Sequence, residues 1–137
     1  MENTNTKSLK RNKIIYWIST IWMSLGMTSS GIIQILKVPE EVSMMEHLGY
    51  PLYFLGFLGV MKIVGVIVIL IPKFVLQKEW AYACFFATML CALYSHLAVG
   101  DPFNETFPPV LLLVLTFTSW YFRPTNRKLP QQQTTSA

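Results

Sequence analysis

The stretch LGYPLYFLGFLGVMKIVGVIVILIP, residues 48–72, decides the fold of this chain. After Pro51 it holds about twenty almost unbroken apolar residues, enough for a helix to cross a hydrocarbon layer of roughly 30 Å. One lysine, Lys62, stands near the middle of this run. A charged side chain at that depth costs about 2.5–3.5 kcal/mol on insertion scales. The stretch therefore predicts a membrane-spanning helix in which Lys62 has a specific partner.

Lys62 shares one helix face with small residues, because Gly59 and Gly65 lie three positions before and after it. Small residues allow a neighbouring helix to approach closely, so we expect Lys62 to point into the protein. The alternative is that its long stem snorkels toward the lipid headgroups. An inward lysine would be neutral, meet a loop carboxylate, or meet an anionic or carbonyl group of a ligand. The sequence leaves these three states open.

The composition indicates one membrane domain, since 53% of the 137 residues are hydrophobic and only 13% are charged. The net charge of +4 could suggest a nucleic-acid partner. We exclude that partner because the basic residues flank the apolar runs, as membrane topology requires. No motif for a metal, a nucleotide or a haem is present, so no catalytic residue is predicted and an enzyme on its own is disfavoured.

The pattern of apolar runs predicts an all-α fold, a four-helix transmembrane bundle with spans at about 14–36, 52–71, 80–99 and 107–122. A signal peptide is the alternative for the first run, but that run is too long and no small-residue cleavage site follows it. Residues 1–13 form a basic lead-in, and residues 123–137 form a basic, then Gln/Thr-rich tail. Both ends are expected to be disordered.

A short interfacial helix is predicted between the first two spans, within residues 37–50. Pro39 suits a first turn, and Gly49 suits the position just after a helix end. Charges then orient the chain. The predicted loop 72–79 and both ends are rich in Lys and Arg, whereas the other side is acidic, so both termini are expected in the cytoplasm.

Polar and small residues predict the helix contacts and a ligand cavity. Gly26, Ser30 and Gln34 recur every four residues on one face of the first span, and the helix contacts are expected at Gly26, Ser30, Gly59 and Gly65. A cavity open to the outer leaflet would unite the remaining polar groups of the spans, Lys62, Tyr94, Ser95, His96 and Gln34. The outer loops add a polar cluster of Glu46, His47 and Asp101.

Two histidine roles remain open. A His96–Asp101 pair could relay protons or form the polar end of a ligand site, or it could simply satisfy an interfacial histidine. No metal is predicted, since the chain has only two histidines and no ligand spacing. Cys84 and Cys91 lie seven residues apart, about 10.5 Å along a helix, so they cannot form a disulfide with each other. We expect both to be buried packing residues.

Several stretches together resemble the DoxX-like family of small four-helix membrane proteins. These are EHLGYP at 46–51, LGVMKIVG at 58–65, IP at 71–72, KEWAYACFF at 78–86, YSHLAVGDP at 94–102 and PP at 108–109. The resemblance covers about residues 13–124. It implies a four-helix bundle in the inner membrane of a bacterium. It implies no settled activity, although the family is named for a subunit of a thiosulfate:quinone oxidoreductase.

Three functions follow as hypotheses. The first, which we favour, is a non-catalytic accessory protein that binds a quinone or lipid-like molecule and supports a redox or stress system. The second is an assembly or scaffold factor without a ligand, which would use the Gly26, Ser30 and Gln34 face for a membrane protein partner or a second copy. The third is a carrier of a small solute. Membrane lipids are expected partners in all three.

Overall fold

Helices account for most of residues 2–130, the part of the chain that the computed structural model describes. Within these residues there are five α-helices, one 3-10 turn and no strand, which confirms the all-α class. The elements are α1 (Glu2–Ile35), α2 (Pro39–His47), α3 (Leu52–Leu70), α4 (Val75–Val99), α5 (Phe103–Tyr121) and η1 (Thr125–Arg127).

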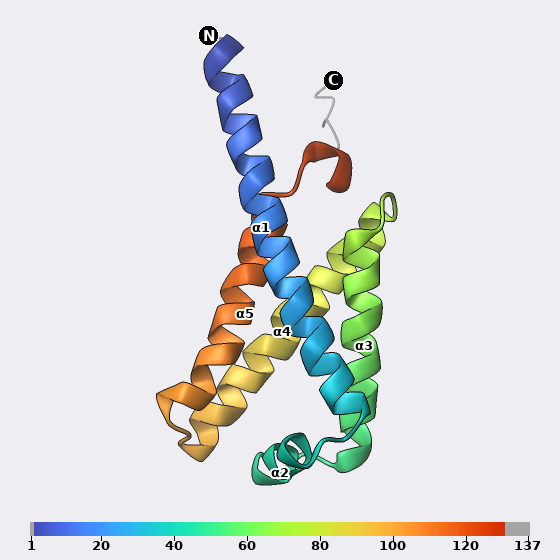
Figure 1. The fold of residues 1–137 in the computed structure, drawn as a ribbon, viewed down its shortest axis with the longest axis vertical. Helices are drawn as coiled ribbons and strands as arrows, with labels where there is room; N and C mark the ends of the chain where they lie inside the picture. The colour runs from blue at the N-terminus through green and yellow to red at the C-terminus, as the bar shows by residue number, and fades with distance from the viewer. Residues whose placement is uncertain (1, 131–137) are drawn as a thin grey trace, which may run out of the picture.

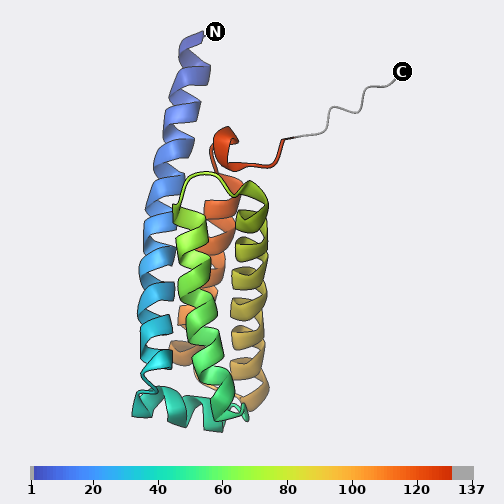
Figure 2. The same ribbon diagram turned by 90° about the vertical axis from the view of Figure 1, so that its right-hand side faces the viewer.

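Four long helices lie side by side, and α2 lies across one end of them (Figures 1 and 2). Helix α1 packs on α3 and α5, and α4 packs on the same two helices, so the four form a closed ring. The N-terminus and η1 lie at the end opposite α2 (Figure 2). The chain thus has a short transverse helix at one end and both described termini at the other.

Helix α2 ends in a hydrogen-bonded turn that positions Tyr50. Gly49 has a φ of +81°, and its N–H bonds to the carbonyl of Glu46, while the N–H of Tyr50 bonds to the carbonyl of Met45. This is a Schellman motif, which favours glycine at the left-handed position. The glycine predicted to follow the short helix is therefore used as expected, and the motif directs the chain into Pro51 and α3.

The structure corrects the prediction of a disordered N-terminal lead-in. Helix α1 begins at Glu2, so the described residues of that lead-in are helical. Lysine, arginine and leucine are good helix formers. Because these residues extend the apolar part of α1, no separate helix nucleation step is needed. Disorder is also wrong for residues 123–130, where Arg123 is buried and η1 forms; residues 131–137 of the predicted tail lie outside the described residues.

The carbonyls at the end of α3 explain the order beyond α5. Lys78 donates hydrogen bonds to the carbonyls of Val68 (2.6 Å) and Ile71. Arg127 donates to those of Ile69 (2.9 Å) and Leu70 (3.3 Å). The last carbonyls of a helix have no partner within it and carry partial negative charge, so cations stabilise them. In the sequence, Lys78 and Arg127 indicated only the membrane topology. In the structure, their side chains also join α4 and η1 to the end of α3.

Two helices, α3 and α4, are long and apolar enough to cross a membrane. Among the described helices, α1 and α5 do not meet that measure, since α1 is rich in serine and threonine and α5 opens with a polar turn. The count of four spans therefore stays a prediction. Helices α4 and α5 each begin several residues before the predicted spans. In α4 the added turn includes Lys78 and Glu79, which find partners inside the fold.

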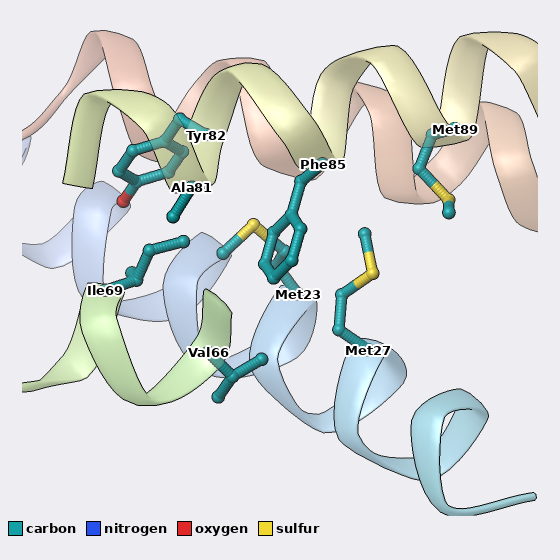
Figure 3. Packing of buried hydrophobic residues seen from close by; sticks show 8 residues of the cluster. All are labelled: Met23, Met27, Val66, Ile69, Ala81, Tyr82, Phe85 and Met89. Carbon is teal, nitrogen blue, oxygen red and sulfur yellow. The ribbon is translucent and has the colours of Figure 1, made fainter. Parts of the chain in front are cut away.

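The buried core lies between α1, α3 and α4 (Figure 3). Methionine dominates it on α1 and recurs on α4, and its flexible side chain fills irregular gaps. Leucines of α5 pack against the same cluster. The core residues are Met23, Met27, Val66, Ile69, Ala81, Tyr82, Phe85 and Met89.

Glycines set the distances between the helices. A Cβ atom on Gly59 would lie 2.6 Å from the backbone oxygen of Gly31, so α1 and α3 touch through their backbones. A Cβ on Gly65 would lie 2.5 Å from the Phe85 ring of α4, and one on Gly26 would lie 2.8 Å from Leu112 of α5. Gly31, which the sequence analysis did not single out, supplies the α1 backbone that Gly59 contacts.

This geometry yields a matched pair of variants. We expect Gly59→Ala to lower the free energy of unfolding by about 1–3 kcal/mol, because the new methyl group meets backbone that cannot move aside. Gly56→Ala is the control, since a Cβ there has no atom within 4 Å. It should be neutral or stabilising, as alanine is the better helix former. Thermal unfolding in detergent measures both, and equal effects of the two variants would contradict the backbone contact.

Candidate functional site

A cavity of about 360 Å³ lies beneath α2, between α1, α3 and α4. Most of its wall is apolar, with side chains from α2, the start of α3 and the middle of α4. Its polar wall residues are Gln34, Glu41, Tyr50, Lys62, Thr88 and His96. This size and composition match small-molecule sites, in which a few polar groups orient a ligand held by apolar contacts.

Lys62 lies in the interior, with 7% of its surface exposed. Its ammonium group donates a hydrogen bond of 2.8 Å to the hydroxyl of Ser30 on α1. Within the described chain this is its one hydrogen bond, although an ammonium group has three donors. Two N–H donors therefore remain for another partner in the cavity that Lys62 lines.

Gln34 presents the complementary group. Its amide nitrogen donates to the carboxylate of Glu41 (3.3 Å), and its amide oxygen is buried without a hydrogen-bond partner among residues 2–130. Turning the amide over would place two acceptors against each other, so the carboxylate fixes the orientation. Lys62, which has spare donors, and Gln34, whose buried amide oxygen has no partner in the described chain, thus both line the cavity. Gln34 lies about one helical turn from Ser30.

His96 borders the cavity and, at the α2 end, forms a cluster with Asp101 and His47. Asp101 accepts hydrogen bonds from Nδ1 of His96 (2.7 Å) and from Nε2 of His47 (2.7 Å). A carboxylate has no proton to donate, so the His96 ring donates from Nδ1 and keeps Nε2 for another partner. The hydrogen bonds from His96 and then His47 hold the pKa of Asp101 below its ordinary value of 3.8.

The predicted site residues divide into two groups. Lys62, Gln34 and His96 line the cavity, and His47 and Asp101 lie together beside it. Glu46 is exposed, and its side chain makes no hydrogen bond or ion pair within residues 2–130. No group of three His, Cys, Asp or Glu side chains in that range could hold a metal ion.

The prediction that Tyr94 and Ser95 line the cavity needs correction. Tyr94 is 73% exposed, because it precedes His96 by two residues and so lies about 160° away around the helix. Ser95 donates to the carbonyl of Cys91, and its oxygen accepts from Tyr50 (2.7 Å). Tyr50, not Ser95, reaches the cavity wall. Sequence reasoning missed Tyr50 and Glu41, which lie in the segment read only as an interfacial helix.

A second cavity of about 290 Å³ continues along α3 and α4 toward the other end. It is almost wholly apolar, and Leu58, Lys62 and Thr88 line both cavities. Lys62 therefore stands where a polar-ended space meets an apolar one. Such a pair of spaces fits a molecule that has a polar head and an apolar chain.

The expectation that both cysteines are buried is wrong. Cys84 and Cys91 are free and exposed. Each lines one of the two cavities, Cys91 the polar-ended one and Cys84 the apolar one. They are exposed because the cavities run along this face of α4, where none of the described helices packs over them.

Together, the fold and the site define a small helical protein with two helices fit for a membrane and a partly open cavity with polar groups at one end. The sequence model of the DoxX-like family matches residues 18–119, which confirms the resemblance seen in the sequence. The chain belongs to the DoxX-like family. No curated protein and no solved structure matches it. The family and the two apolar helices indicate a membrane protein.

The Asp101 cluster predicts a defined pH dependence. A carboxylate whose pKa is depressed by folding stabilises the fold above its unfolded pKa, and this stabilisation is lost as the pH falls through the folded pKa. We therefore expect Asp101→Asn to lower the melting temperature near neutral pH. The gap between wild type and variant should shrink as the pH falls below 3.8.

Thermal unfolding between pH 7 and about pH 3 tests this expectation. Glu46→Gln is the control, because it removes a carboxylate that makes no hydrogen bond or ion pair within the described chain. Its melting temperature should follow the wild-type curve. A gap between wild type and Asp101→Asn that stays constant over the whole pH range would disprove the role given to Asp101.

Proposed function

We propose that the chain is a multi-pass protein of the bacterial inner membrane that binds a quinone or lipid-like molecule in the cavity beneath α2. It acts as a non-catalytic accessory to a redox or stress system. The observation that carries this proposal is the pairing of spare donors on the buried Lys62 with an unpaired acceptor on Gln34 in one apolar-walled space.

The chemistry of these two groups selects the ligand class. A quinone carbonyl accepts a hydrogen bond from the ammonium of Lys62. Once the head is reduced to a quinol, its hydroxyl group also donates a hydrogen bond, as the amide oxygen of Gln34 requires. The apolar cavity on the far side of Lys62 suits the chain that such molecules carry. A small polar solute would leave that apolar space unused, which argues against a carrier.

The scaffold hypothesis loses the surface on which it relied. It used the face of Gly26, Ser30 and Gln34 for a partner. In the folded chain Gly26 packs against Leu112 of α5, Ser30 bonds to Lys62, and Gln34 is buried. Because this face is occupied within the chain, it offers a partner protein little to bind.

Charge supports an orientation with four spans. The end of the molecule near α2 carries the acidic residues Glu40, Glu41, Glu46, Asp101 and Glu105. The opposite end carries most of the lysines and arginines. By the positive-inside rule, both termini and the loop between α3 and α4 lie in the cytoplasm, and α2 lies at the outer interface.

Labelling of single cysteines tests this topology. In a Cys84→Ala/Cys91→Ala background, Asn104→Cys should react with a membrane-impermeant maleimide in intact cells. Lys73→Cys should react only after lysis, because its loop is placed inside. Both native positions are exposed. If Lys73→Cys were labelled in intact cells, the proposed orientation or the proposed number of spans would be wrong.

Binding of a short-chain benzoquinone tests the ligand. Trp80 lines the apolar cavity, so its fluorescence should be quenched when the quinone binds. We expect Lys62→Met to weaken binding by at least about tenfold. The reason is that a hydrogen bond to a charged group contributes about 1.5–3 kcal/mol, and about 1.4 kcal/mol is tenfold.

Lys73→Met is the matched control, since it removes an exposed lysine that lines neither cavity. It should bind the quinone as tightly as the parent. Both variants should be compared at equal melting temperature or with the fraction folded measured. A stable Lys62→Met protein with unchanged affinity would remove the central residue of the proposed site.

A further inference from the structure

A separate pocket of about 620 Å³ lies at the end of the molecule that carries both described termini. One wall is the N-terminal part of α1, which extends beyond the other helices (Figure 2). The other wall is the chain that leaves α5 and forms η1. The lining residues from α1 are Leu9, Asn12 and Lys13, which recur at the spacing of one helix face.

The pocket is positively charged. Lys13, Arg123 and Lys128 line it, and none of its lining residues is acidic. Arg123 is buried, and its guanidinium is paired with Glu79 at 2.6 Å. Lys13 makes no side-chain hydrogen bond or ion pair within the described chain, and Lys128 makes one long contact of 3.4 Å to the carbonyl of Tyr121. Both lysines thus keep N–H donors for an anion.

Apolar and aromatic side chains complete the wall. Trp120, Tyr121 and Phe122 line the pocket beside the exposed Leu9. Tryptophan and tyrosine gather at membrane–water interfaces, at the level of the headgroups. A free phosphate ion has no apolar part to contact these side chains. A phospholipid does, because its glycerol and acyl chains lie next to its phosphate.

The two walls are held in place by contacts within the protein. Arg127 of η1 bonds to the carbonyls of Ile69 and Leu70. Its guanidinium also lies 5.1 Å from the centre of the Trp17 ring on α1, a cation–π distance. These contacts tie η1 to both α3 and α1. The pocket therefore does not depend on a ligand for its shape.

From these observations we propose that the pocket binds the headgroup of an anionic phospholipid, with its phosphate between Lys13 and Lys128. Basic pockets on the cytoplasmic side of membrane helices suit such headgroups. All of the lining residues lie outside the segment 18–119 that matches the family, and none of them lines the cavities at Lys62. The site is therefore additional to the cavity at Lys62 and independent of the ligand proposed there.

The test uses the purified full-length chain in detergent and native mass spectrometry. The probes are phosphatidylglycerol, phosphatidylcholine and inorganic phosphate. We expect the parent to retain phosphatidylglycerol in preference to phosphatidylcholine. Lys13→Gln/Lys128→Gln should weaken this binding by roughly 25-fold, because each cation near an anionic lipid contributes roughly fivefold.

The control pair Lys10→Gln/Lys73→Gln removes the same charge from exposed lysines outside the pocket. It should leave the preference for phosphatidylglycerol almost unchanged. Equal losses in the two pairs would show diffuse charge attraction and overturn the proposal. Displacement of the lipid from the parent by millimolar inorganic phosphate would also overturn it, because the pocket would then take free phosphate.

Discussion

The hydrogen bond between Lys62 and Ser30 is the interaction on which the rest of the structure depends. A buried ammonium group needs a partner, and α1 supplies one because Gly31 and Gly59 let the two backbones touch. The same approach holds α1 against α3 on one side of the cavity. A larger residue at Gly59 would separate α1 from α3 and remove the Ser30 hydroxyl from the reach of Lys62. The close packing of α1 on α3 and the hydrogen bond of Lys62 thus both depend on the one crossing of these helices.

Charges at the two ends of the bundle serve the fold as well as the topology. At the end that carries the described termini, Lys78 and Arg127 satisfy the carbonyls that end α3. At the α2 end, Asp101 links His47 of α2 to His96 of α4. Each set ties together segments distant in sequence. The helices are therefore fixed at both ends by polar contacts, while the apolar cavities lie between them.

Local patterns predicted the helical class, the short helix with Gly49 behind it, and the family. They also located Lys62, Gln34 and His96, because a polar residue in an apolar run is visible in the sequence alone. What they missed depends on contacts between distant segments. The order of residues 123–130 requires Arg127 to reach α3, and the exposure of Cys84 and Cys91 follows from which face of α4 is left uncovered. No periodicity within one segment contains that information.

The position of Lys62 also limits which ligands the cavity suits. Lys62 lies at the junction of a space of about 360 Å³ with polar groups at its wall and an apolar space of about 290 Å³. A ligand that filled only the first space would leave apolar wall exposed, and one that filled only the second would leave the amide oxygen of Gln34 unpaired. Both costs vanish only for a molecule with a polar head and an apolar chain. His96, held by Asp101 through Nδ1, would then stand beside the head, with Nε2 left for a hydrogen bond.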